Sequence, residues 1–125
     1  MSSVLSDKAW EAQDKAQLYR GQTKVGCALQ TEDYRVWTGA NIEMPFNHGI
    51  HAEVAAIISA MRFDPATRIR TMLIAAPRPR FTPCGACMDW IMWFGEHETQ
   101  IIHEYSPGQE SGVWDAGNLM PHYPQ

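Results

Sequence analysis

Two segments of this chain are expected to form helices with apolar residues on nearly every side. They are HAEVAAIISAMRF, residues 51–63, and CGACMDWIMWF, residues 84–94. A helix of this kind is stable when it is buried against other elements. A continuous apolar run of strand length, IRTMLIAA at 69–76, lies between them in the sequence. The three segments therefore predict an α/β fold in which helices pack on a sheet.

The rest of the chain completes this pattern with one more helix and several strands. A first helix is expected at 6–19, with Ser6 as its N-cap. Strands are expected at 24–31 and 34–42, which would form a hairpin, at 99–105, and after a turn at 113–117. The order predicts one partly antiparallel sheet with helices on both faces. With 125 residues, the chain is expected to be a single domain, residues 1–125.

Composition and charge exclude several classes of partner. The formal net charge is −4, so the chain lacks the basic field that nucleic-acid binding requires. No apolar run approaches the length of a membrane span, and the first residues do not resemble a signal peptide. Three cysteines, of which Cys27 is far from the other two, argue against a disulfide framework. We therefore expect a cytoplasmic protein with a small-molecule substrate and neither a nucleic-acid nor a membrane partner.

The segment TPCGACMDW, residues 82–90, places two cysteines three positions apart at the start of a helix. Such a pair can be a redox dithiol, half of a structural zinc site, or half of a catalytic metal site. His51 begins the other apolar helix, and both helices follow strands, so their N-termini are expected at the same end of the sheet. His51, Cys84 and Cys87 would then give zinc three ligands and leave a fourth position open, as in catalytic sites.

Two further expectations concern the chemistry of this cluster. Helix N-termini favour negative charge, so we expect both thiols to ionise more easily there. Glu53 follows His51 by two residues, which places a carboxylate at the same helix end. A carboxylate beside an open metal position could accept and deliver protons, whereas a structural site has no use for one.

The motif HAE at 51–53 followed by PCGAC at 83–87 resembles the signature of zinc deaminases. With KVGCALQT, GANIE and a late NLMP, the resemblance to small cytidine deaminases extends over most of the chain. It implies a three-layer α/β/α fold with a five-stranded mixed sheet, a bound Zn²⁺ and a homotetramer. It also implies zinc-dependent deamination of cytidine or deoxycytidine, with Glu53 as the catalytic acid–base group.

The resemblance also implies how a nucleoside would be held. Asn41 and Glu43 of GANIE match the family's ribose-binding residues, and the backbone N–H of Ala52 matches the group that holds the base carbonyl. We expect the polar groups of Asn41 and Glu43 to be buried and to find partners only when a nucleoside is bound. A solvated strand end is the alternative interpretation of these two residues.

The chain departs from the family pattern at several positions. Thr23 replaces a Phe that lies against the substrate, which suggests a pocket of different shape. His51 replaces a Cys found in many tetrameric members, and Met88 replaces an Arg. The last two changes fit together, because two thiolates and a neutral His leave Zn²⁺ uncharged and remove the need for a neighbouring cation.

These departures keep two alternatives open. One is the same chemistry on a modified cytosine nucleoside, blasticidin-type or N4-substituted, or on another aminated base. The other is a non-catalytic zinc-binding module. In the first case Arg78 and Arg80 could reach a phosphate or carboxylate of a larger substrate, although a solvated loop is the simpler interpretation.

The remaining candidate residues are expected to be structural. Cys27 lies in an apolar strand and is expected in the core. Trp90 and Trp93 are three apart on an apolar helix, which favours packing. Solvated or structural roles are expected for His48, His97, His103 and His122.

Overall fold

A computed structural model describes residues 2–46 and 48–124 of the chain. The elements, in chain order, are α1 (Ser2–Gln13), β1 (Gly26–Thr31), β2 (Val36–Ala40), α2 (Ala52–Phe63), β3 (Ile69–Ala75), α3 (Gly85–Phe94), β4 (Gln100–Ser106), β5 (Gln109–Asp115) and α4 (Ala116–Leu119). The strands form one sheet in the order β2-β1-β3-β4-β5. Only β3 and β4 pair in parallel, and the other three pairs are antiparallel. The predicted five-stranded mixed sheet is therefore confirmed.

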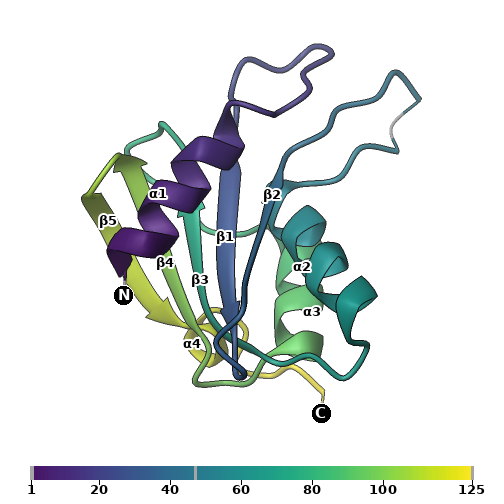
Figure 1. Cartoon of the computed structure of the whole chain (residues 1–125), viewed down its shortest axis with the longest axis vertical. Coiled ribbons are helices and arrows are strands. Elements are labelled where there is room, and N and C mark those ends of the chain that lie inside the picture. Colours follow the sequence, from purple (N-terminus) through teal and green to yellow (C-terminus); the bar gives the residue numbers. More distant parts are fainter. Residues whose placement is uncertain (1, 47, 125) are drawn as a thin grey trace.

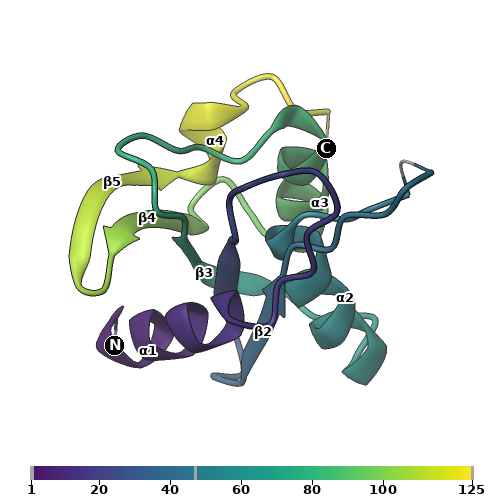
Figure 2. The same ribbon diagram turned by 90° about the horizontal axis from the view of Figure 1, so that it is seen from above.

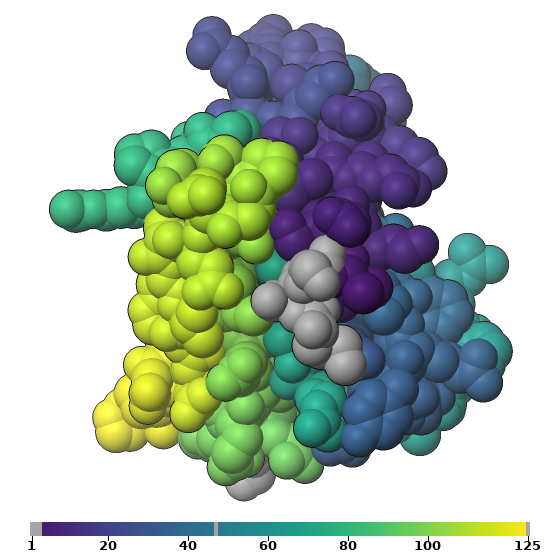
Figure 3. All heavy atoms as spheres, turned by 60° about the vertical axis from the view of Figure 1, so that its left-hand side comes forward, coloured from purple at the N-terminus to yellow at the C-terminus, as the bar shows by residue number. Residues whose placement is uncertain are grey.

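Helices cover both faces of this sheet, as the sequence predicted. Figures 1 and 2 show α1 on one face and α2 and α3 together on the other. The larger apolar cluster lies under α2 and α3 and includes Cys27, Ile57, Ile74 and Ile91, all fully buried. The smaller cluster, with Leu5, Ala28 and Leu73, lies under α1. On that face α1 does not cover β5, and the two lie beside each other in Figure 3.

The strand directions bring the starts of α2 and α3 together. Both β2 and β3 run antiparallel to β1, so their carboxyl ends lie at the same edge of the sheet. The chain goes from β2 through a loop into α2, and from β3 through a loop into α3. The close approach of α2 to the sheet requires a glycine, because a Cβ on Gly39 would lie 2.4 Å from the backbone nitrogen of Ala56.

The first helix and the fifth strand differ most from their predicted bounds, and the other elements differ by one or two residues at their ends. The first helix ends at Gln13 rather than at Tyr19, because Gln17 leaves the helical path to pair with Ile42. Ser6 is not an N-cap: it lies inside the helix and donates a hydrogen bond to the Glu104 carboxylate over 2.6 Å.

The C-terminal region also departs from the prediction. The fifth strand begins earlier than expected, at Gln109, and pairs with β4 across a short turn. In that turn Gly108 adopts a left-handed conformation with φ of 77°, which a glycine accepts without strain. Ala116 and Gly117 belong to α4 rather than to the strand.

The helices on the larger cluster are not covered on every side. Trp93 of α3 is 65% exposed and Phe63 of α2 is 54% exposed, so a single chain leaves part of both apolar helices in contact with solvent. No helix among residues 2–46 and 48–124 has the length and apolar character needed to cross a membrane.

Candidate active site

His51, Cys84 and Cys87 come together at the adjoining ends of α2 and α3. His51 is the N-cap residue of α2 and Cys84 is the N-cap residue of α3. The Nδ1 atom of His51 lies 3.4 Å from Sγ of Cys84 and 3.2 Å from Sγ of Cys87. The three candidate ligand atoms all lie within 4.8 Å of one another.

The geometry of this cluster fits a tetrahedral zinc ion. Zinc binds sulfur at about 2.3 Å and nitrogen at about 2.0–2.1 Å, so two ligands in a tetrahedron are about 3.5–3.8 Å apart. The observed separations of 3.2 and 3.4 Å are close to this spacing. A disulfide would instead need the two sulfurs bonded to each other, and both cysteines are free thiols. The residues present therefore fit a zinc site with three protein ligands.

The expectation that both thiols ionise easily is wrong for Cys87. Its side chain is buried, and burial raises the pKa of the thiol well above its ordinary value. The nearby carboxylate of Glu53 and the thiol of Cys84 raise the pKa further. Since a cysteine binds zinc as a thiolate, the thiol of Cys87 has to lose its proton when the ion binds.

Glu53 lies beside this cluster in an apolar environment. It is 1% exposed, and neither carboxylate oxygen has a hydrogen-bond partner among the residues that the structure describes. Burial raises the pKa of Glu53, an effect partly opposed by its own backbone amide and by the charge of His51. A buried polar group without a partner destabilises a fold. Its presence here indicates that the carboxylate is kept for a ligand or a reaction.

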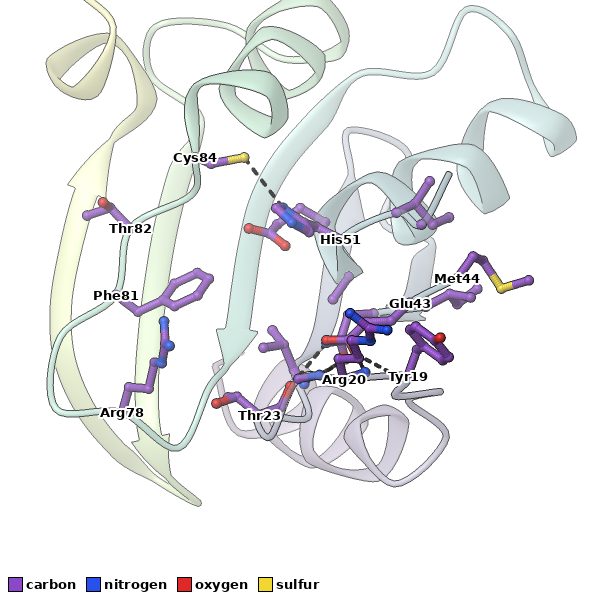
Figure 4. A pocket seen from close by; sticks show the side chains of 18 of the residues that line it. Tyr19, Arg20, Thr23, Glu43, Met44, His51, Arg78, Phe81, Thr82 and Cys84 are labelled. Atoms are coloured by element: carbon purple, nitrogen blue, oxygen red, sulfur yellow. Dashed lines mark hydrogen bonds between the residues drawn. The ribbon is translucent and has the colours of Figure 1, made fainter. Parts of the chain in front are cut away.

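One cavity of about 910 Å³ contains these groups and opens to the surface. His51, Glu53 and Cys84 line it together with Asn41, Glu43 and Ala52. Figure 4 shows Cys84 and His51 at one end and Glu43 some way from them. The structure thus brings all the predicted site residues, except the buried Cys87, to the surface of one cavity.

Asn41 and Glu43 already have hydrogen-bond partners without a ligand. The expectation that they find partners only when a nucleoside is bound is therefore wrong. The side chain of Asn41 accepts a hydrogen bond from the Val25 amide over 2.9 Å and donates one to the Thr23 carbonyl over 3.1 Å. The Oε1 atom of Glu43 accepts three backbone N–H bonds at 2.7–3.0 Å, from Tyr19, Arg20 and Gly21.

These three hydrogen bonds also change the pKa of the Glu43 carboxyl. The backbone N–H groups of Gly21, Tyr19 and Arg20 lower the pKa of its carboxyl, so it remains ionised. A Cβ on Gly21 would lie 2.0 Å from Oε2 of Glu43, so a larger residue at this position would displace the carboxylate. For a substrate, Glu43 can still offer Oε2, and Asn41 can offer its second amide hydrogen.

Ala52 is fully buried at the first turn of α2. The amides of a first helical turn have no acceptor within the helix, so its N–H is suited to a substrate carbonyl. Met88 is 3% exposed within the larger apolar cluster. An apolar side chain suits that position. Zinc bound by two thiolates and a neutral His carries no excess negative charge, so no Arg is needed there to balance it.

The structure adds cavity residues that sequence analysis missed. Phe81 lines the cavity from the loop before α3, and its ring lies 5.5 Å from that of His103. His103 is fully buried on β4, and its Nε2 lies 2.9 Å from the carbonyl of Ala76, at the root of the same loop. These contacts with Ala76 and Phe81 agree with the structural role expected for His103. The sequence feature that could have indicated that Phe81 lines the cavity is its position close to the C-x-x-C motif.

The other residues considered in the sequence lie outside the metal cluster. Cys27 is fully buried in the core, and its burial raises the pKa of the thiol. His48 is exposed and does not line the cavity. His97 and His122 are exposed as well. The Tyr123 hydroxyl donates a hydrogen bond to the carboxylate of Asp89 on the same chain over 2.7 Å.

Known proteins resemble this chain in sequence and in structure. Residues 2–103 match the family model described as the cytidine and deoxycytidylate deaminase zinc-binding region. A cytidine deaminase from Burkholderia pseudomallei is 26% identical, with a TM-score of 0.86 and coverage of 98% of both chains.

Two further solved structures show the same fold at lower identity. The cytidine deaminase from Mycobacterium leprae is 24% identical with a TM-score of 0.81, and coverage is 97% of this chain and 98% of that one. The enzyme from Bacillus anthracis is 18% identical with a TM-score of 0.71, and coverage is 96% and 86%. With a family match over most of its length and a His/Cys/Cys cluster spaced for zinc, the chain belongs to the zinc-binding cytidine and deoxycytidylate deaminase family.

Proposed function

We propose that this protein deaminates cytidine or deoxycytidine to uridine or deoxyuridine and releases ammonia. One observation carries the proposal: Glu53, a buried carboxylate without a hydrogen-bond partner among the described residues, lies next to three candidate zinc ligands in a cavity large enough for a nucleoside. The family match and the similarity to the Burkholderia pseudomallei cytidine deaminase support it.

The roles of the chain's own residues follow from their positions. Zinc, when bound by His51, Cys84 and Cys87, lowers the pKa of a coordinated water toward neutrality and so supplies a nucleophile. Glu53 takes a proton from the attacking water and delivers it to the ring nitrogen beside C4. It then takes the proton of the hydroxyl added at C4 and delivers it to the amino group, which leaves as ammonia while C4 becomes a carbonyl, so that a C–O bond replaces the C–N bond. The Ala52 amide holds the base carbonyl in position.

The apolar surroundings of Glu53 suit this role. Because burial raises its pKa, the carboxylate is a stronger base than in water and is better matched to proton transfer near neutral pH. A non-catalytic zinc-binding module has no use for such a group, and this argues against that alternative.

The sugar is proposed to bind at Asn41 and Glu43, and this can be tested with the free base. A site built to hydrogen-bond a group rejects analogues that lack it by up to about 10⁴-fold. We therefore expect cytosine to be a far poorer substrate than cytidine. Glu43→Ala should reduce the ratio of kcat/KM for cytidine to kcat/KM for cytosine, mainly by lowering the value for the nucleoside.

A second variant separates sugar binding from loop support. Since Glu43 also holds the amides of residues 19–21, Glu43→Ala is expected to loosen that loop as well. Glu43→Gln keeps a carbonyl oxygen for those amides and changes only the charge and the donor pattern. Steady-state kcat/KM for cytidine and cytosine is the measurement, and a wild-type preference for cytosine would refute the assignment of Asn41 and Glu43.

A modified cytosine nucleoside is the second candidate substrate. Thr23 lines the cavity where the family has a larger aromatic residue, which leaves room beside the base for a substituent. Ammonia release from cytidine, deoxycytidine, N4-substituted and blasticidin-type nucleosides, adenosine and guanine tests both candidates in one assay. The screen also tests a role in pyrimidine salvage, which would require turnover of the unmodified nucleosides.

We further propose a cytoplasmic homotetramer. The exposed aromatic side chains of Phe63 and Trp93 lie on the two helices that pack over the larger apolar cluster. Contact with other subunits would remove this apolar surface from water. Light scattering at micromolar concentration should give the mass of a tetramer, and a monomer would contradict the proposal.

A further inference from the structure

Three arginines, Arg20, Arg78 and Arg80, line the cavity of the candidate active site. None of them forms an ion pair with a carboxylate in the described part of the chain, where the ion pair found joins Arg35 to Asp33. Arg20 instead lies over the ring of Tyr19, with its guanidinium carbon 5.2 Å from the ring centre. The cavity of an acidic protein thus carries three cations that have no acidic partner among the described residues.

The acidic groups of the same cavity are already engaged. Glu43 receives three backbone N–H bonds from residues 19–21. Glu53 is buried, and it lines the cavity together with the candidate ligands His51 and Cys84. Neither carboxylate is paired with Arg78 or Arg80. The positive charge on that wall is therefore available to an anion that enters from solvent.

The loop that carries Arg78 and Arg80 is held in a defined position. It has the sequence Pro77-Arg78-Pro79-Arg80, and each proline restricts the backbone on both sides of it. At its root, the carbonyl of Ala76 accepts the Arg78 amide over 2.7 Å and lies 2.9 Å from Nε2 of the buried His103. A restricted loop loses little conformational entropy when its side chains bind a ligand.

The cavity has room for more than a nucleoside. Its volume of about 910 Å³ lies near the upper end of the range of about 300–1,000 Å³ typical of small-molecule sites. Figure 4 shows Arg78 on the same wall as Phe81, across the pocket from Arg20 and Glu43. Arginine side chains there can bind the oxygens of a phosphate or carboxylate with paired N–H donors.

We propose that the preferred substrate of this protein carries an anionic group, a phosphate or a carboxylate, remote from its amino group, and that Arg78 and Arg80 bind it. The inference rests on the proposed function, since it places the anion on a cytosine nucleoside whose C4 faces the metal ligands. The anion takes no part in the reaction, and its contribution is binding.

The test compares three substrates that share one base: cytidine, cytidine 5′-phosphate and cytidine 5′-carboxylate. Wild-type kcat/KM should be about 10- to 100-fold higher for at least one of the anionic substrates than for cytidine, because hydrogen bonds to charged groups are strong. The double variant Arg78→Gln/Arg80→Gln should lose this advantage mainly through KM, with cytidine turnover changed less than about threefold. Salt should weaken the wild-type preference.

A matched control removes the same charge elsewhere. Arg62 and Arg70 do not line the cavity, so Arg62→Gln/Arg70→Gln should keep the preference for the anionic substrate. The faster of the two anionic substrates identifies the group. Equal wild-type values for all three substrates, or an equal loss in the control, would overturn the proposal and leave the deaminase assignment intact. Absence of ammonia release from every cytosine compound would instead refute the proposed function.

Discussion

Glu53→Gln should retain zinc and the fold but lose nearly all turnover. A general acid–base group typically contributes about 10²–10⁴-fold to rate, and Glu53 is proposed to move protons both to the ring and to the leaving group. The loss should appear in kcat, because a glutamine amide has almost the same shape and leaves the cavity intact. The measurement is kcat for ammonia release from cytidine, with metal content determined on the same sample.

The Tm of Glu53→Gln is a second, independent measurement on the same variant. The Glu53 carboxylate is buried without a hydrogen-bond partner in the part of the chain that the structure describes, and its burial raises its pKa, so ionised Glu53 destabilises the fold. The uncharged glutamine should therefore keep or raise the Tm, since groups kept for activity often reduce stability. Glu11→Gln, on the exposed side of α1, serves as the control and should change neither Tm nor kcat. Near wild-type kcat in Glu53→Gln would restore the non-catalytic zinc-binding module as the better interpretation.

Cys84→Ala should remove the metal and the activity together. Zinc bound through three protein ligands loses one of its two thiolates in this variant, and the remaining His51 and Cys87 are a poor site for the ion. We expect the zinc content to fall from about one per chain to well below that, with turnover lost to the detection limit. Because Cys84 is exposed at the start of α3, its replacement should have little effect on core packing.

Cys27→Ala is the matched control for this experiment. Cys27 is a free thiol in the core and does not belong to the cluster of candidate ligands, so its replacement should lower the Tm but leave one zinc per chain. Full zinc occupancy in Cys84→Ala would contradict the ligand assignment. Removal of zinc from the wild-type protein by a chelator should abolish turnover in the same way, and added zinc should restore it.

Local sequence patterns were sufficient to predict the metal cluster. The C-x-x-C motif begins one apolar helix and His51 begins the other, and the strands before both helices end at the same edge of the sheet. This spacing, together with Glu53 two residues after the histidine, depends on helix geometry and strand direction. Both are encoded in short segments, which is why they could be predicted from the chain alone.

The ends of the elements were predicted less well, because long-range contacts set them. The pattern of small residues extends the first helix to Tyr19, but Gln17 instead pairs with Ile42 from the far side of the hairpin. That pairing brings residues 19–21 beside Glu43, whose carboxylate then receives three of their amides. No local pattern contains this information.

The sequence by itself therefore predicted the α/β class, the three candidate zinc ligands and the proposed proton-transfer group, since short local motifs mark them, HAE at 51–53 and C-x-x-C at 84–87. Tertiary structure alone decided what else faces the substrate. Phe81, Arg78 and Arg80 line the cavity because the loop before α3 is fixed at Ala76 by His103 of β4. Asn41 and Glu43 have partners without a ligand because residues 19–25 lie beside them. These contacts join segments that are 16 to 27 positions apart, so they form only when the sheet is assembled.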